Sequence, residues 1–152
     1  MSELVRGSSV PLFDRLASSE APGGVGAFLL LPEQLEASVA RELSRLFNTR
    51  CRLPFSAISE STGTAIDYGI PDFSVLSPRN DEDRTLMEKA LAHAVSQFEP
   101  RMRNVAVKVS EVPGRGDTAS ATVSGDLSIG LKARRVSFAL SLNPSANENP
   151  AG

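Results

Sequence analysis

The sequence predicts an α+β fold in which two main helices pack on the apolar face of a small antiparallel sheet. Two observations predict the helices, because apolar residues recur at helical spacing over residues 32–48 and again over residues 80–98. A third observation predicts the sheet, because from about residue 103 apolar residues occupy every second position. A short amphipathic helical element is also expected near the N-terminus, at residues 11–17.

The first main helix is expected over residues 32–48. Pro32 suits the first turn, where its missing N–H is not needed, and Asn48 suits the end because asparagine tolerates the left-handed conformation. The residues expected on its apolar face are Leu35, Val39, Leu43, Leu46 and Phe47.

The second main helix is expected over residues 80–98. Asn80 and Asp83 have the spacing of a capping box, and the first turn is rich in acidic residues, which the helix dipole favours. Pro100 cannot continue the helix and biases Glu99 away from helical geometry. The expected apolar stripe consists of Met87, Leu91, Ala94, Val95 and Phe98.

Three strands are expected after the second helix, over residues 103–110, 119–131 and 136–142. The segments "PGRGD" at 113–117 and "KARR" at 132–135 are interpreted as the turns between them. Short connections between consecutive strands predict an antiparallel meander with one buried face and one face in water. The candidates for an open sheet edge are the strands at 119–131 and 136–142, and the pattern does not choose between them.

Three segments are distinguished by composition: an N-terminal docking segment and linker at 1–26, one compact domain at 27–143, and a tail at 144–152 that is expected to be disordered. Leu12, Phe13 and Leu16 would share one side of the N-terminal element. Such an element docks either on a partner or on its own domain, and both alternatives stay open here.

The composition of the chain excludes several classes of protein. The chain has 152 residues, enough for one domain with a real core, and its net charge of -2 argues against a general nucleic-acid binder. Cys51 is the single cysteine, which fits a reducing compartment. No secretory signal is visible and no apolar run approaches the ~20 residues of a membrane span, so a cytoplasmic protein is expected.

No motif predicts catalysis, a metal or a cofactor. The single histidine, His93, is expected to be an ordinary helix-surface residue, and no nucleophile-elbow motif accompanies it. Glycoside hydrolysis needs two carboxylates, and Glu60, Asp67, Asp72 and Glu99 are candidates by residue type. Nothing in the sequence pairs two of them across a cleft, so the chain is predicted not to be an enzyme.

Glu99, Pro100 and Arg101 place an acid and a base on either side of a helix-stopping proline. In one interpretation, the rigid backbone presents the two charges to a partner through charge-assisted hydrogen bonds. In the other, they pair with each other or with nearby charges and only finish the helix. An exposed pair of that kind contributes about 0 to 1 kcal/mol to stability.

Three segments occur in a specific order: "ELSRLFNTR" (42–50), "DYGIPDFS" (67–74) and "FEPRMRNVAVKV" (98–109). Together they resemble TssE, the family of baseplate subunits in bacterial type VI secretion systems, which is similar to the lysozyme-like wedge protein of contractile-phage baseplates. "LFDRL" (12–16) resembles the short N-terminal element of that family. The resemblance covers most of residues 12–142.

The resemblance implies a structural role in the cytoplasm, in a baseplate docked on an inner-membrane complex. It implies contacts with the wedge proteins TssF and TssG through Glu99, Pro100 and Arg101, and with the sheath subunits TssB and TssC through strand exchange that helps to start sheath polymerisation. TssK would be reached through the wedge. The alternative function is a lysozyme-like peptidoglycan hydrolase, for which the residues supply no catalytic pair.

Overall fold

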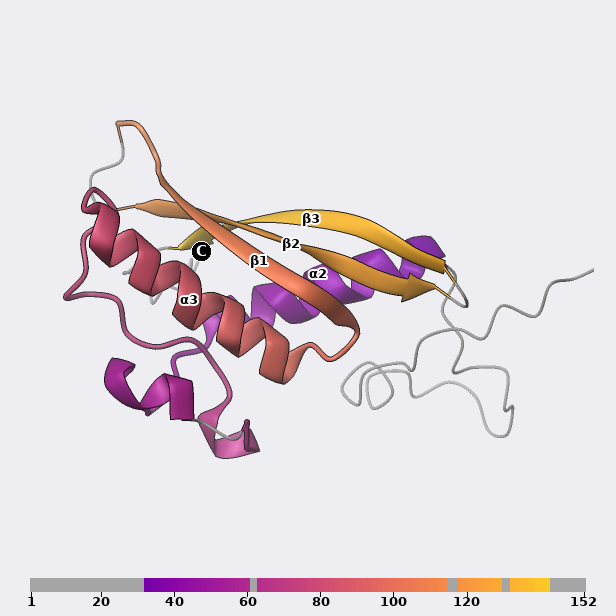
Figure 1. The fold of residues 1–152 in the computed structure, drawn as a ribbon, viewed down its shortest axis with the longest axis horizontal. Helices are drawn as coiled ribbons and strands as arrows, with labels where there is room; N and C mark the ends of the chain where they lie inside the picture. Colours follow the sequence, from indigo (N-terminus) through magenta and orange to yellow (C-terminus); the bar gives the residue numbers. More distant parts are fainter. Residues whose placement is uncertain (1–31, 61–62, 115–117, 130–131, 143–152) are drawn as a thin grey trace, which may run out of the picture.

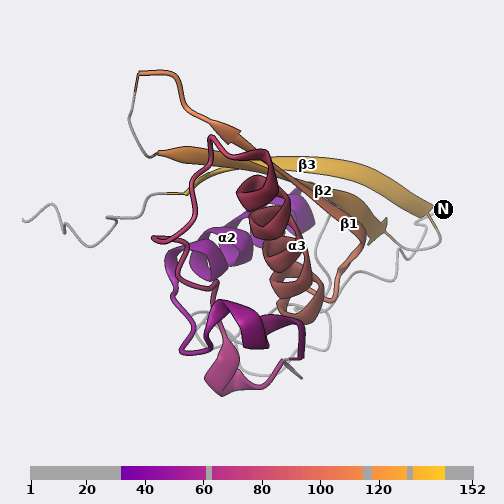
Figure 2. The same ribbon diagram turned by 60° about the vertical axis from the view of Figure 1, so that its left-hand side comes forward.

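The computed structural model describes residues 32–60, 63–114, 118–129 and 132–142. Two α-helices lie on one face of a three-stranded antiparallel sheet, which gives a helix layer and a sheet layer (Figure 1 and Figure 2). The predicted α+β class, with two main helices and a meander, is therefore confirmed. The elements are α2 (Pro32–Asn48), η2 (Phe55–Glu60), η3 (Ala65–Asp67), α3 (Asp81–Phe98), β1 (Met102–Glu111), β2 (Ala119–Ile129) and β3 (Lys132–Leu142).

Helix α2 begins and ends where its sequence pattern predicts. All five residues of its expected apolar face are at most 4 % exposed and belong to the central core cluster. Burying each such Leu, Val or Phe side chain stabilises the fold by about 1.5–3 kcal/mol. Ser38 lies on the same face between Leu35 and Val39 and is also fully buried.

Helix α3 is capped by Asn80, whose side-chain oxygen accepts the N–H groups of Glu82 (2.8 Å) and Asp83 (3.4 Å). The reciprocal half of the predicted capping box is not formed. The Asp83 carboxylate instead accepts the N–H of Ser77 at 2.9 Å, and the N–H of Asn80 donates to the Ser77 carbonyl at 3.1 Å. Asp83 is one methylene shorter than the usual Glu, and it ties the preceding loop to the helix.

The sheet has the strand order β1-β2-β3. On β2 the odd-numbered residues Ala119, Ala121, Val123 and Leu127 are at most 2 % exposed and face the helices. One prediction about the strands is wrong, because residues 132–135 belong to β3, with Lys132 paired to Ile129, and are not a turn. Of the two candidates for an open edge, β3 is an edge of the sheet, whereas β2 pairs on both sides. The other edge is β1.

A β-bulge interrupts β1, which the sequence pattern did not indicate. The register with β2 shifts between Arg103 and Ala106, and Asn104 has a positive φ of 51°. The Asn104 amide donates to the Asp126 carboxylate at 2.8 Å. Opposite the bulge, a Cβ on Gly125 would lie 3.0 Å from the Arg103 carbonyl oxygen, a backbone atom of the bulged strand, so the bulge leaves little room for a larger residue at position 125.

The loop between the helices is partly packed against the core, as its apolar content predicts. Arg50 and Ile70 form a short parallel bridge, and Ile70 and Ile58 are buried. Ile66 and Val75 are the exceptions, because they are 80 % and 84 % exposed.

Leu12, Phe13 and Leu16 lie outside the described residues, as do the linker and the tail, so the proposed division at 26 and 143 stays a prediction. Within the described ranges, neither α-helix combines the length and apolar character needed to cross a membrane.

Candidate interaction site

The corner between α3 and β1 is built by backbone hydrogen bonds on both sides of Pro100. The N–H of Glu99, the C-cap residue, donates to the Val95 carbonyl at 2.8 Å, and this is the last hydrogen bond of the helix. The N–H of Met102 donates to the Glu99 carbonyl at 3.1 Å. Pro100 is exposed at the tip of this turn. The helix stop predicted at Phe98 is confirmed.

Glu99 and Arg101 form a bidentate ion pair beneath that tip. Arg101 Nε donates to Glu99 Oε1 at 2.6 Å, and Nη2 donates to Oε2 at 2.5 Å. The two side chains are only 10 % (Arg101) and 3 % (Glu99) exposed. Arg101 Nη1 also donates to the Ser38 hydroxyl of α2 at 3.0 Å, so the pair fastens the corner to the other helix.

Of the two interpretations that the residues left open, the internal pairing is present, and it is buried rather than exposed. Partner binding by these residues remains a prediction. Ser38 was missed because it lies 63 residues from Arg101 in sequence. The only indication of this contact in the sequence is the place of Ser38 on the apolar face of the first helix, because a buried serine there needs a hydrogen-bond partner.

Of the four carboxylates considered for hydrolysis, Asp67, Asp72 and Glu99 have local partners, and Glu60 is exposed at the end of η2. Asp67 accepts the Thr64 hydroxyl at 2.7 Å, and Glu99 is held by Arg101. Asp72 accepts the N–H of Ser74 at 2.9 Å, and this backbone hydrogen bond lowers the pKa of Asp72. A general acid needs a raised pKa, so the environment of Asp72 opposes that role.

His93 is half-buried, and its Nε2 atom is buried without a hydrogen-bond partner among the described residues. It lines a cavity of about 10 Å³ together with Cys51 and Asp67. A volume of that size is about one water molecule. In the described part of the chain, no three His, Cys, Asp or Glu side chains are grouped as a metal site.

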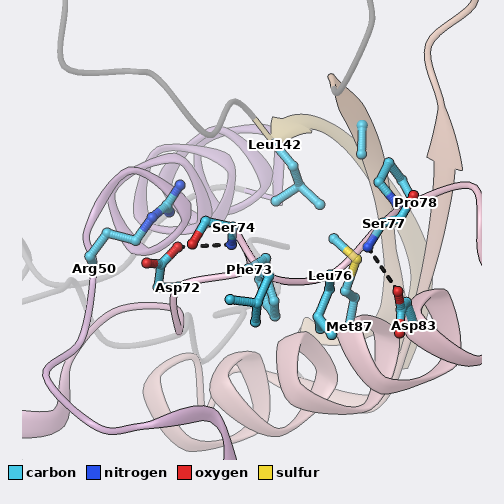
Figure 3. A pocket seen from close by; sticks show the side chains of 12 residues that line it. Arg50, Asp72, Phe73, Ser74, Leu76, Ser77, Pro78, Asp83, Met87 and Leu142 are labelled. Atoms are coloured by element: carbon cyan, nitrogen blue, oxygen red, sulfur yellow. Dashed lines mark hydrogen bonds between the residues drawn. The ribbon is translucent and has the colours of Figure 1, made fainter.

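A larger pocket of about 350 Å³ lies between the loop at 72–78, the first half of α3 and the end of the sheet. Figure 3 shows the apolar side chains of Phe73, Leu76, Met87 and Leu142 turned toward one another, with Arg50 and Asp72 at one side. No local sequence pattern indicates this pocket, because its walls come from Arg50, the loop at 72–78, helix α3 and the ends of strands β2 and β3.

The two sheet edges differ. At β1, Glu88 of α3 accepts the N–H of Val109 at 3.0 Å, so a backbone donor that points away from β2 already has a partner. Lys108 adds an ion pair with Glu88 at 3.4 Å. At β3, Phe138 and Leu140 face the helix layer but are only partly buried, whereas their β2 partners Val123 and Ala121 are fully buried.

Comparison with known proteins supports a family assignment. The family model "Baseplate wedge protein gp25" matches residues 33–134, about two thirds of the chain. Of the solved structures, a chain from "The baseplate complex from the type VI secretion system" is 20 % identical, covers 73 % of this chain and 96 % of its own, and superposes with a TM-score of 0.51. At that identity the structural likeness shows a shared fold. No curated protein sequence matches. On the family match, this chain belongs to the baseplate wedge protein gp25 family.

Proposed function

We propose that this chain is the TssE-type baseplate subunit of a bacterial type VI secretion system, acting in the cytoplasm. It would join the wedge proteins to the contractile sheath and help to start sheath polymerisation. The observation that carries the proposal is the family match over residues 33–134, which includes both helices, β1 and β2. The shared fold with a chain of a type VI baseplate complex supports it.

The α3–β1 corner is the proposed contact with the wedge proteins TssF and TssG. The charged groups of Glu99 and Arg101 are mostly buried and bind each other, and Pro100 is exposed between them. The contact would therefore consist of Pro100 and the small exposed part of Arg101, with Glu99 holding Arg101 in place. A corner fixed in this way loses little conformational entropy on docking.

Co-expression with TssF and TssG from the same bacterium tests this contact by pull-down. Pro100→Trp should reduce the captured complex while the thermal midpoint stays near wild type, because the substitution adds bulk at an exposed position. Ser96→Trp, at an exposed position on α3, is the control and should bind normally. Normal capture by Pro100→Trp would remove the corner from the interface, and no capture by wild type would reject the proposed function.

The open edge at β3 is the proposed contact with the sheath subunits TssB and TssC. An added strand would form a backbone ladder with β3, and its apolar side chains would complete the cover over Phe138 and Leu140. The β1 edge is the poorer acceptor because Glu88 already occupies the N–H of Val109.

A proline scan over residues 137–140 tests the edge. Successive N–H groups of a strand point alternately to its two sides, so two of the four variants should break the β2 ladder and unfold more easily. The other two should fold normally and lose binding to a TssB–TssC heterodimer. If these two stably folded variants bind as wild type does, β3 is not the acceptor.

Leu12, Phe13 and Leu16 are proposed as a second contact with the baseplate partners, and TssK would be reached only through the wedge. The role is proposed to be binding without turnover. Purified protein incubated with peptidoglycan should therefore release no fragments, and release of muropeptides above a buffer control would favour the hydrolase alternative.

A further inference from the structure

The pocket of about 350 Å³ begins where the β3 edge ends. Leu142, the last residue of β3, pairs with Ala119, the first residue of β2, and both line the pocket. Phe73 and Leu76 of the loop and Met87 of α3 form the rest of its apolar wall, as Figure 3 shows. The pocket is thus a continuation of the apolar row that β3 presents to the helix layer.

That row has a regular spacing. Val136, Phe138, Leu140 and Leu142 occupy every second position on the helix side of β3. A strand added beside β3 would also turn every second side chain to this side, at intervals of about 6.6 Å. Its side chains would lie along the partly buried Phe138 and Leu140, and the one beyond Leu142 would reach the pocket.

The pocket has a mixed lining, because Arg50, Asp72 and Asp83 lie beside its apolar side chains. The carboxylates of Asp72 and Asp83 each accept a backbone N–H group, from Ser74 and Ser77, at 2.9 Å. Val75 also lines the pocket and is 84 % exposed, so it adds an apolar side chain at the open side of the pocket. The apolar side of the pocket, formed by Phe73, Leu76, Met87 and Leu142, matches a large aliphatic or aromatic side chain.

We infer that this pocket binds a large apolar side chain of the partner strand that adds to β3. The inference rests on the strand addition proposed above and specifies the sequence of that strand. The strand should carry apolar residues at every second position, and the residue at its end that passes Leu142 should be Leu, Met, Phe or a similar side chain.

Photo-crosslinking tests which residue occupies the pocket. A benzoyl-phenylalanine at Val75 should crosslink to the TssB–TssC heterodimer in the presence of the wedge proteins, at an apolar residue flanking an extended segment. The same probe at Ile66 is the control, because Ile66 is similarly exposed at 80 % but does not line the pocket. Crosslinks from Val75 to residues 1–31 of this chain, or to a second copy, would overturn the inference by naming another occupant.

A substitution at the pocket rim gives a quantitative test. Ser74 is exposed at the rim, so Ser74→Trp should cover the pocket without disturbing the core, and it should weaken heterodimer binding by about tenfold or more. Ser96→Trp, at an exposed serine near the end of α3, should change binding little. If proline variants of β3 abolish binding while Ser74→Trp does not, the pocket inference fails and strand addition stands. If neither affects binding, both fail.

Discussion

Arg101 donates to both carboxylate oxygens of Glu99 although the two residues flank an exposed proline. Arg101→Ala would leave the Glu99 carboxylate buried without its counter-charge, and Ser38 would lose a donor. We expect a loss of about 3–5 kcal/mol in the free energy of unfolding, measured by urea denaturation.

A double variant separates the ion pair from the packing. Glu99→Met with Arg101→Met replaces both charged groups by apolar side chains, of similar length at position 99 and shorter at position 101. Replacing both members of a buried ion pair by apolar residues is often close to neutral. The double variant should therefore be more stable than Arg101→Ala. Equal losses in both variants would show that the two charges contribute little beyond their packing.

The sequence predicted the elements better than it predicted the site. The helical periods correctly predict the buried faces of both helices, because burial of a continuous apolar stripe determines each helix. The predicted residues that are buried are Leu35, Val39, Leu43, Leu46, Phe47, Met87, Leu91, Ala94 and Val95, and Phe98 is partly buried. The bulge at Asn104 and the contact of Arg101 with Ser38 depend on segments distant in sequence, which no local pattern encodes. The charge run at 132–135 resembled a turn by composition, yet it lies on a partly exposed edge strand.

Tyr68 should titrate above its ordinary pKa of 10.0. Burial is the main cause, the nearby Glu42 carboxylate adds to it, and the ring packs edge-on against Phe98 at 5.2 Å. The chain has one tyrosine and no tryptophan, so near-ultraviolet absorbance reports this phenol alone. We expect the folded protein to ionise at higher pH than the urea-unfolded chain.

The sign of the stability effect follows from that shift. Because the folded-state pKa is raised, the contribution of Tyr68 is fully present below about pH 10 and is lost as the pH rises through the folded-state value. Wild type should lose stability relative to Tyr68→Phe above that pH. A parallel decline in both proteins would show that other groups cause the alkaline loss.

Gly69 should be among the least replaceable glycines of the described chain. Its φ is +128°, and a Cβ there would lie 2.7 Å from the Thr49 carbonyl oxygen and 2.8 Å from the Cys51 nitrogen, both backbone atoms. Gly114 is the matched control, since its φ is +78° and a Cβ added to it would meet no atom of the described chain within 4 Å.

Gly114→Ala should cost about 1–2 kcal/mol through its backbone conformation alone. Gly69→Ala should cost about 1–3 kcal/mol more, because the loop must move away from the bridge between Arg50 and Ile70. Thermal midpoints of the two variants measure the difference, and equal midpoints would mean that the loop yields easily.

Glu88 should protect the β1 edge from other chains. Its carboxylate accepts the Val109 N–H, so Glu88→Ala would return that donor to solvent at a cost of about 0.5–1.5 kcal/mol and leave an exposed strand edge. We expect sedimentation velocity to show self-association of the variant at concentrations at which the sedimentation coefficient of wild type stays constant. Glu88→Gln keeps an acceptor and should behave like wild type. Lys108→Ala removes only the exposed ion pair, so association in that variant as well would point to lost charge rather than to an opened edge.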